Sequence, residues 1–359
     1  MGAQKFKSPL HKMSVTTPTD LWNDSCSVSE LEYSIDNGCV GATANPVIVA
    51  EVLKKERAKW EPTIRQLIAD NPTASEDDIA WKLVEEMSKT GAKLLLPIFE
   101  KGDGKVGRLS LQTNPQFYRN ADKMVEQAVR FDALAPNMII KIPVTAAGIE
   151  AIEEVTFRGV SINATVSFCV AQAIAVAEAV ERGLDRREKA GHDISRMGSV
   201  CTLMVGRMDD WLKVVANKED IITNPENLDW AGVAMMKKAY QIYQERGYRV
   251  RALSAATRNH RHWSEFIGGD VVVTLTHGWQ KRFNGSDIDA VPRMDIPVDP
   301  AILAELDKKF VDFRRGYDEK GMTPAEFDGY GPTKKTLSGF IGAQHDFVGD
   351  IRSYMIPGV

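Results

Sequence analysis

Residues 138–168 read MIIKIPVTAAGIEAIEEVTFRGVSINATVSF, an apolar run, an amphipathic stretch and a second apolar run. The runs 138–142 and 160–168 are short and rich in Ile and Val, which is typical of strands buried on both faces. The stretch 145–157 between them has the periodicity of a helix. This order predicts two parallel strands joined by a right-handed helical crossover.

The same alternation of apolar runs and amphipathic stretches continues on both sides of this segment. Six further runs are predicted to be strands: 17–24, 41–43, 106–112, 199–205, 249–256 and 270–275. With the two central runs they make eight strands, nearly all separated by predicted helices, which is the pattern of a (β/α)8 TIM barrel. A doubly wound parallel sheet is the structural alternative. We therefore expect an α/β fold with one TIM-barrel domain over 1–359, made of a barrel at about 16–285 and a C-terminal helical extension at 286–359.

Several local signals outside the strands predict further structure. Residues 1–15 have the character of an unpacked arm, and Ser27-Val28-Ser29-Glu30 matches a capping box that would open a helix. Residues 185–197 form a polar insertion after a helix predicted at 170–182. Other predicted helices are 63–69, 75–96, 300–315 and 333–354, the last two packed on the barrel.

The composition fits a folded globular protein without a surface for nucleic acid or membrane. The chain has 359 residues, of which 43% are hydrophobic, and a formal net charge of -4. No basic stripe is present that would bind nucleic acid. No apolar run approaches the roughly 20 residues that span a bilayer, and the N-terminus lacks the apolar core of a secretory signal. We expect a cytoplasmic protein whose cysteines are reduced and act as small apolar residues. They are Cys26, Cys39, Cys169 and Cys201.

Two short motifs are similar to ligand-binding signatures but stand in the wrong context. Residues 102–107, GDGKVG, have the spacing of a dinucleotide-binding fingerprint. They follow a predicted helix and precede a strand, so we interpret them as a turn. His260 and His262 are two residues apart on a predicted helix, where their rings diverge, and no cluster of Cys or carboxylate residues accompanies them. We interpret both as surface histidines and expect neither a metal nor a cofactor.

Lys141 is the one charged residue in the otherwise apolar run 138–142. In a strand buried on both faces, apolar surroundings lower the pKa of a lysine and make a neutral amine available near pH 7. Such an amine can attack a ketone and form a Schiff base. The alternative is a lysine whose side chain reaches solvent at the strand end or pairs with a carboxylate. The run alone does not decide between the two.

Polar side chains recur where the predicted strands end. They are Asp24, Asn45, Gln112, Lys141, Asn163, Thr165 and Thr202. In a barrel these ends converge on the face that carries active sites, although any single residue of this kind could instead cap a helix or form a turn. Arg207 and Arg258 follow the sixth and seventh strands, where loops often bind phosphate. Surface ion pairs are the alternative role for these two arginines.

With these residues in this order, the sequence resembles the transaldolase family of class I aldolases, which includes the fructose-6-phosphate aldolases. The similarity covers about residues 21–275. It rests on LWNDS (21–25), TANP (43–46), IIKIP (139–143), INATVSF (162–168), VGR with DW (205–207 and 210–211) and ATRN (256–259). The resemblance implies a TIM barrel and a transaldolase-type transferase of the pentose phosphate pathway. Such an enzyme moves a dihydroxyacetone unit from a ketose or ketose phosphate to an aldehyde through a lysine Schiff base.

The resemblance also implies a role for each matched residue. Lys141 would form the Schiff base, and Asp24 would take the proton of the C4 hydroxyl as the C–C bond breaks. Thr165 would position a water that carries protons, and Gln112 would orient that water. The implied substrate-binding residues are Asn45, Asn163, Thr202, Met204, Arg207 and Arg258, with the two arginines holding phosphate.

Four positions depart from the family pattern. Gln112 stands where transaldolases have Glu and is similar to the fructose-6-phosphate aldolase branch, but a glutamine cannot take a proton. Met204 replaces the Phe of transaldolases and the Tyr of that branch, while Thr202 and Ala256 each replace a Ser. These departures motivate the alternative of an aldol lyase or synthase of the fructose-6-phosphate aldolase type that acts on an unusual ketose.

A barrel that binds sugar phosphates without catalysis is the third hypothesis. The joint presence of Lys141, Asp24 and Asn163 disfavours it. For the enzymatic hypotheses we expect sugar or sugar-phosphate substrates, no nucleic-acid or membrane partner, and a homodimer as a candidate assembly.

Overall fold

The computed structural model describes residues 6–356 and contains a closed barrel of eight parallel strands. The strands follow one another round the barrel in chain order, and β8 closes it by pairing with β1. They are β1 (Asp20–Asn23), β2 (Cys39–Ala44), β3 (Arg108–Gln112), β4 (Met138–Pro143), β5 (Ile162–Ser167), β6 (Val200–Leu203), β7 (Arg251–Ser254) and β8 (Val272–Leu275). The closed barrel confirms the predicted (β/α)8 fold and excludes the doubly wound sheet.

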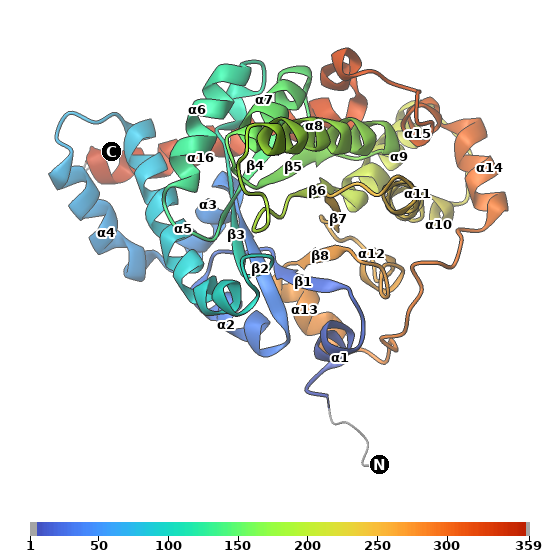
Figure 1. Cartoon of the computed structure of the whole chain (residues 1–359), viewed down its shortest axis with the longest axis horizontal. Coiled ribbons are helices and arrows are strands. Elements are labelled where there is room, and N and C mark those ends of the chain that lie inside the picture. Colours follow the sequence, from blue (N-terminus) through green and yellow to red (C-terminus); the bar gives the residue numbers. More distant parts are fainter. Residues whose placement is uncertain (1–5, 357–359) are drawn as a thin grey trace.

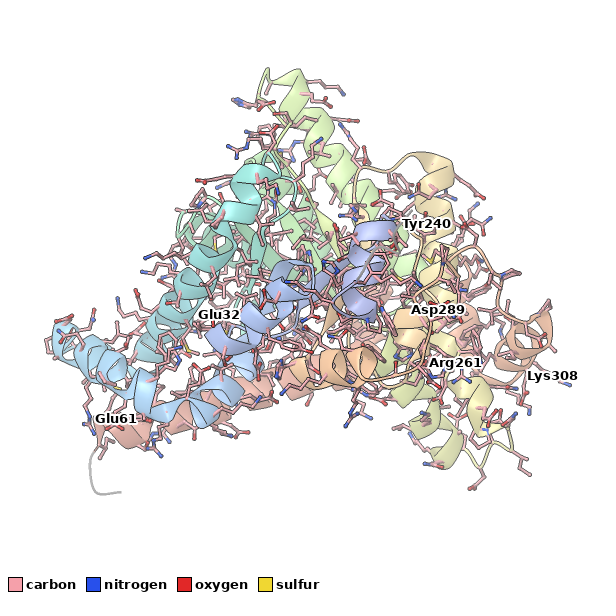
Figure 2. All side chains as sticks on the ribbon, turned by 90° about the horizontal axis from the view of Figure 1, so that it is seen from below. Glu32, Glu61, Tyr240, Arg261, Asp289 and Lys308 are labelled. Atoms are coloured by element: carbon pink, nitrogen blue, oxygen red, sulfur yellow. The ribbon has the colours of Figure 1, made fainter. Side chains whose placement is uncertain are left out.

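Helices surround the barrel, and most of them connect one strand to the next (Figure 1). Those of the barrel part are α1 (Pro9–Thr16), α2 (Val28–Asp36), α3 (Pro46–Lys55), α4 (Arg57–Asp70), α5 (Glu76–Lys101), η1 (Pro115–Phe117), α6 (Ala121–Asp132), α7 (Ala146–Phe157), α8 (Val170–Lys189), α9 (Val205–Lys218), α10 (Pro225–Leu228), α11 (Ala231–Arg246), α12 (Arg261–Ser264) and α13 (His277–Asn284). The C-terminal helices are α14 (Pro300–Lys309), α15 (Val311–Tyr317), η2 (Pro324–Gly329) and α16 (Gly331–Met355). Figure 2 shows charged side chains on the helices of both parts, among them Glu32 on α2 and Lys308 on α14.

The interior of the barrel has an apolar layer below a polar one. The apolar layer consists of Trp22, Ile139, Val200, Leu253, Ala255 and Val272. Gly41 makes room for the indole, because a Cβ at this position would lie 2.4 Å from the Trp22 ring. Side chains two residues further along a strand project to the same side, so Asp24 follows Trp22 and Lys141 follows Ile139 toward the carboxyl ends. The period of the strands therefore places polar groups at the end of the barrel where active sites lie.

The last helix, α16, packs on the barrel, as predicted for the C-terminal helices. It contacts α3, α5, α9 and β5. Thr333 near its start accepts a hydrogen bond from Gln172 on α8 at 3.3 Å, and Arg352 near its end pairs with Glu76 on α5 at 2.6 Å. Both ends of α16 are therefore fixed to the helices that surround the barrel.

Two predictions for the N-terminal part are wrong. Within the predicted arm, residues 9–16 form α1, because Leu10 and Met13 are fully buried. Residues 1–5 of that arm lie outside the described residues. Ser27 precedes α2, but its side chain makes no capping hydrogen bond and donates to Glu56 instead. The expected capping box is therefore absent.

Several predicted helix bounds differ from those in the structure. Helix α4 runs through Pro62 and α5 through Pro97, because tertiary packing outweighs the local preference of proline to end a helix. Helix α8 extends to Lys189, into the polar insertion, where Arg186 pairs with two carboxylates of α7. The helix predicted at 300–315 is divided into α14 and α15 at Phe310, an extended residue that is 1% exposed.

Three smaller expectations can be compared with the structure. All four cysteines are free and buried, and burial raises the pKa of the Cys26 thiol to about 12 and that of Cys39 to about 11, so these two thiols are poor nucleophiles. Residues 102–107 form the turn between α5 and β3, as predicted. No helix among residues 6–356 is long and apolar enough to cross a bilayer.

Candidate active site

Three of the candidate residues lie side by side on neighbouring strands. Gln112 on β3 pairs in register with Lys141 on β4, and Lys141 pairs in register with Asn163 on β5. Residues paired in this way on parallel strands project to the same side of the sheet, so all three side chains share one region. Thr165 pairs with Pro143 one step further toward the carboxyl end. The register of the barrel therefore brings together residues that are far apart in the sequence.

The Lys141 side chain is buried without a partner for its charge. The residue is 5% exposed, and its Nζ takes part in no hydrogen bond or ion pair within residues 6–356. Burial lowers the pKa of Lys141, while the charge of Asp24 raises it and that of Arg207 lowers it further. Asp24 accepts a hydrogen bond from the Thr43 hydroxyl and lies beyond ion-pair distance of the lysine. The arrangement favours the neutral amine, which is the form that attacks a carbonyl.

A chain of hydrogen bonds crosses the barrel beside Lys141. The Thr202 hydroxyl donates to Asn163 Oδ1 at 2.6 Å, and Asn163 Nδ2 donates to Ser110 Oγ at 3.0 Å. Asn163 is wholly buried, so these bonds fix the orientation of its amide. The sequence reasoning missed Ser110 and Thr43. Strand alternation could have found them, since they lie two residues before Gln112 and Asn45.

Gln112 and Thr165 provide groups that could hold a water next to Lys141. Gln112 is 2% exposed, and its Oε1 is a buried acceptor without a donor in the described part of the chain. Thr165 is wholly buried, and within residues 6–356 its hydroxyl makes one hydrogen bond, to Met204 Sδ at 4.0 Å. A hydroxyl can donate and accept, whereas the amide oxygen of Gln112 only accepts. The pair can orient a water, but neither member is a base at neutral pH.

The backbone is strained at two points next to the candidate residues. Val166 has φ +57 and Ala256 has φ +62, in the left-handed region that non-glycine residues rarely adopt. The register between β5 and β6 shifts at the same place, between Ala164 and Ser167. Such conformations cost on the order of 1–3 kcal/mol and concentrate at functional sites. The end of β5 and the loop after β7 are therefore strained next to the candidate residues.

Asn45 has a structural contact as well as a position at the site. It is the N-cap of α3, and its Oδ1 accepts from the backbone N–H of Ile48 at 2.9 Å. The alternative of a helix cap is therefore real for this residue. Its Nδ2 makes no hydrogen bond among residues 6–356, so two donors remain for a ligand.

The two arginines differ in how they are held. Arg258 pairs with Asp210 at 2.9 Å, so the alternative of a surface ion pair describes its resting state. Arg207 is partly buried, has an Nε without a partner in the described chain, and lies over the Phe340 ring at 5.5 Å. Burial lowers the pKa of Arg207, and the charge of Arg258 lowers it further. Arg207 is the more available cation for an anionic ligand.

Phe340 is a neighbour of Arg207 that the sequence did not indicate. It lies on α16, 5% exposed, far along the chain from Arg207. No motif or strand period connects the two positions, because the contact depends on how the C-terminal helix packs. We know of no signal in a single sequence that could have found it.

The interpretation of His262 as a surface residue is wrong. His260 is exposed, but His262 is wholly buried, and its Nε2 lies 2.9 Å from Asp209 Oδ2. The rings do diverge, as expected from their spacing, but one of them points into the protein. Its carboxylate partner comes from α9, a contact that spacing along the chain cannot reveal.

Comparisons with known proteins agree with this geometry. A model of the Transaldolase/Fructose-6-phosphate aldolase family matches residues 21–321. A transaldolase of Mycolicibacterium paratuberculosis is 32% identical over 246 residues, which are 66% of this chain and 64% of that protein. Transaldolases of Mycolicibacterium smegmatis and Mycobacterium ulcerans are each 32% identical over 232 residues, which are 63% of this chain and 61% of those proteins. The match therefore spans less than two thirds of the length of these relatives.

Proposed function

Because the chain belongs to the transaldolase/fructose-6-phosphate aldolase family, we propose that it is a transaldolase-type transferase. It moves a dihydroxyacetone unit from a ketose or ketose phosphate to an aldehyde through a Schiff base on Lys141. The observation that carries this proposal is the buried Lys141 amine, which has no ion-pair partner within residues 6–356. Burial lowers the pKa of this lysine and so favours the neutral amine, which is the nucleophilic form.

The first half of the reaction cleaves the donor. The neutral Nζ of Lys141 attacks the C2 carbonyl, and loss of water from the carbinolamine gives an iminium. Thr165 and Gln112 hold the water that carries protons in this step. Asp24 then takes the proton of the C4 hydroxyl, the C3–C4 bond breaks, and its electrons move into the iminium to give an enamine. The aldehyde product leaves, and the three-carbon unit stays on Lys141.

The second half reverses these steps with another aldehyde. The enamine attacks the acceptor carbonyl, Asp24 returns its proton to the new alkoxide, and hydrolysis of the Schiff base frees the product ketose. Asn45 and Asn163 bind hydroxyls of the three-carbon unit, and Arg207 with Arg258 binds the anionic end of donor and acceptor. Thr202 and Met204 shape the pocket wall next to Asn163 and Thr165, which they contact.

A transfer assay tests this function. We expect the protein with fructose 6-phosphate and an acceptor aldehyde to form a new ketose, and to do so equally well in EDTA. The iminium is itself the electron sink that a metal would supply in a metal-dependent aldolase, which is why no metal is expected. Absence of any new ketose with a panel of aldehydes would refute the transferase, and a requirement for a divalent ion would refute the metal-free mechanism.

Gln112 favours a second candidate, an aldol lyase or synthase of the fructose-6-phosphate aldolase type. A glutamine at this position orients a water without taking its proton, and its free Oε1 is suited to that task. The two candidates differ in the fate of the three-carbon unit. Release of dihydroxyacetone without an acceptor, at a rate that rivals transfer, would favour the lyase.

The proposed substrates also suggest where the protein works. Sugar phosphates are charged metabolites of the cell interior, so we place the reaction in the cytoplasm and in the pentose phosphate pathway. A homodimer is the candidate assembly. Light scattering on the purified protein tests the assembly, and a monomer at micromolar concentration would refute it.

A further inference from the structure

The loops that carry Arg207 and Arg258 are joined by a buried Asp–His pair that the proposed reaction does not use. Asp209 lies on the second turn of α9, and His262 lies on α12. Both side chains are 0% exposed, and Asp209 Oδ2 lies 2.9 Å from His262 Nε2. The other ring nitrogen, Nδ1, accepts from the backbone N–H of Arg258 at 3.1 Å.

These contacts fix the tautomer of the imidazole. Because Nδ1 accepts a hydrogen bond, it carries no proton, and the proton of the neutral ring lies on Nε2 and is donated to Asp209. Asp209 Oδ1 accepts in turn from the backbone N–H of Gly232 at 2.8 Å. Burial raises the pKa of Asp209, and the contact with His262 opposes that rise. Asn259 Nδ2 also lies 3.5 Å from His262 Nε2. Both ring nitrogens and both carboxylate oxygens therefore have a partner, and the pair connects three backbone segments.

Two more contacts hold the same segments together. The backbone at Gly206 is so close to the next loop that a Cβ there would lie 1.9 Å from the Ala256 carbonyl oxygen. Arg258 also pairs with Asp210, the neighbour of Asp209. The start of α9 and the loop after β7 therefore behave as one unit, with one arginine on each half.

We propose that Asp209 and His262 are positioning residues that set the placement of Arg258 relative to Arg207, and so create the site for the phosphate end of the substrates. The inference rests on the proposed function, in which these two arginines bind that end. Neither Asp209 nor His262 touches substrate. They act through the backbone of Arg258, which the imidazole holds at its N–H.

Replacement of Asp209 by Asn breaks the pair with almost no change in shape. The amide oxygen can accept from His262 or from Gly232, and its NH2 group then faces the other donor. If the imidazole changes tautomer to accept from that NH2 group, its Nδ1–H faces the N–H of Arg258. One donor–donor conflict remains in every arrangement. Whichever contact is lost, the imidazole that accepts from the N–H of Arg258 is held less firmly, so we expect the backbone of Arg258 to move.

The test compares a phosphorylated and an unphosphorylated ketose in borohydride trapping at Lys141. We expect Asp209→Asn to lower the trapping efficiency with fructose 6-phosphate about tenfold relative to fructose, because only the phosphate reaches the arginines. Trapping with fructose itself stays unchanged. His262→Gln keeps a donor for Asp209 but loses the ring nitrogen that accepts from Arg258. It should also lower trapping with fructose 6-phosphate relative to fructose, and it replaces Asp209→Asn if that variant does not fold.

Glu265→Gln is the matched control, since it also changes a poorly exposed carboxylate to an amide. Glu265 is 15% exposed and pairs with Lys237 at 2.8 Å, so this variant reports general destabilisation. It should leave the ratio unchanged. A ratio that stays at the wild-type value in Asp209→Asn and His262→Gln would overturn the proposal, as would an equal fall in Glu265→Gln.

Hydrogen exchange at the peptide that contains Arg258 separates this inference from the proposed function. We expect faster exchange there in Asp209→Asn than in the wild type, because the N–H of Arg258 loses a well-placed acceptor. If the wild type traps neither ketose, the proposed function is refuted, and hydrogen exchange alone then tests the positioning role of Asp209 and His262. Unchanged exchange would then overturn the positioning role, and faster exchange would support it.

Discussion

The barrel interior around Lys141 and the outer layer around Lys237 each bury a lysine, to 5% and 9% exposure. Lys237 on α11 donates to Glu265 at 2.8 Å and to the carbonyl oxygens of Arg293 and Ile296 at 3.0 and 2.6 Å. Lys141 has no such partner within residues 6–356. The two lysines are therefore similarly buried, and they differ in whether their N–H donors have acceptors.

This difference separates a structural lysine from a reactive one. Three acceptors satisfy the N–H donors of Lys237 and hold its side chain at the junction of α11 with the segment after β8. At Lys141 the surrounding groups are amides, hydroxyls and apolar side chains, and the nearest charges are those of Asp24 and Arg207. The first lysine contributes to the fold, and the second is kept in a state that costs stability and permits chemistry.

The largest predicted effect comes from replacing each lysine by Met. Lys141→Met should lower turnover by at least about 10⁴-fold, because the nucleophile is lost, and should not destabilise the protein. Lys237→Met should retain turnover and lower the free energy of unfolding by about 3 kcal/mol, because Glu265 loses its partner. Steady-state kinetics and urea unfolding measure the two quantities. The distinction between a reactive Lys141 and a structural Lys237 would be refuted if Lys141→Met kept turnover, or if Lys237→Met folded but lost turnover.

Asp24→Asn is expected to have the next largest effect. Loss of the general base should lower turnover by about 10²–10³-fold, since Asp24 is the carboxylate proposed to take the C4 hydroxyl proton. The amine of Lys141 remains, so reduction by borohydride should still trap a ketose on it. Failure of both turnover and trapping would place Asp24 in Schiff-base formation instead of C–C cleavage.

The fold was more predictable from the sequence than the site. The strand period and the order of runs were sufficient for the barrel, and they placed Lys141 correctly among Gln112 and Asn163. The tertiary contacts were less predictable. Ser110 follows from strand alternation, but the contacts of Phe340 with Arg207 and of Asp209 with His262 depend on helix packing, which no local pattern encodes. The buried ring of His262 could not be predicted because its carboxylate comes from another element.

The pH dependence of borohydride trapping at Lys141 provides a further test of how this lysine differs from Lys237. Because burial lowers the pKa of Lys141, the trapping rate should rise about tenfold per pH unit and reach its plateau below the ordinary value of 10.5. At pH values between the lowered pKa of Lys141 in the folded protein and its ordinary pKa in the unfolded chain, the unfolded chain binds more protons at Lys141 than the folded one. The contribution of Lys141 to the free energy of unfolding therefore rises with pH in this range. Lys141→Met should remove that slope from the unfolding free energy.

Asp24→Asn provides the control for this pH profile. The charge of Asp24 raises the pKa of Lys141, so its removal should move the midpoint of trapping to lower pH. A midpoint at the ordinary lysine value in the wild type, or a shift to higher pH in the variant, would contradict the electrostatic account.

The smallest predicted effect concerns α16. Phe340→Leu removes the ring over Arg207 and should raise the KM for a phosphorylated donor about two- to fivefold, in keeping with about 0.5–1 kcal/mol for such a contact. Phe347→Leu on the same helix is the control, since Phe347 is 1% exposed and no cation among residues 6–356 lies over its ring. Equal changes in KM for both variants would assign the effect to helix packing.

Borohydride reduction in the presence of a panel of phosphorylated and unphosphorylated ketoses, followed by peptide mass spectrometry, tests the central claim most directly. We predict a three-carbon adduct on the peptide that contains Lys141 and none on the peptide that contains Lys237. No adduct with any ketose, or an adduct on Lys237 in place of Lys141, would contradict the account.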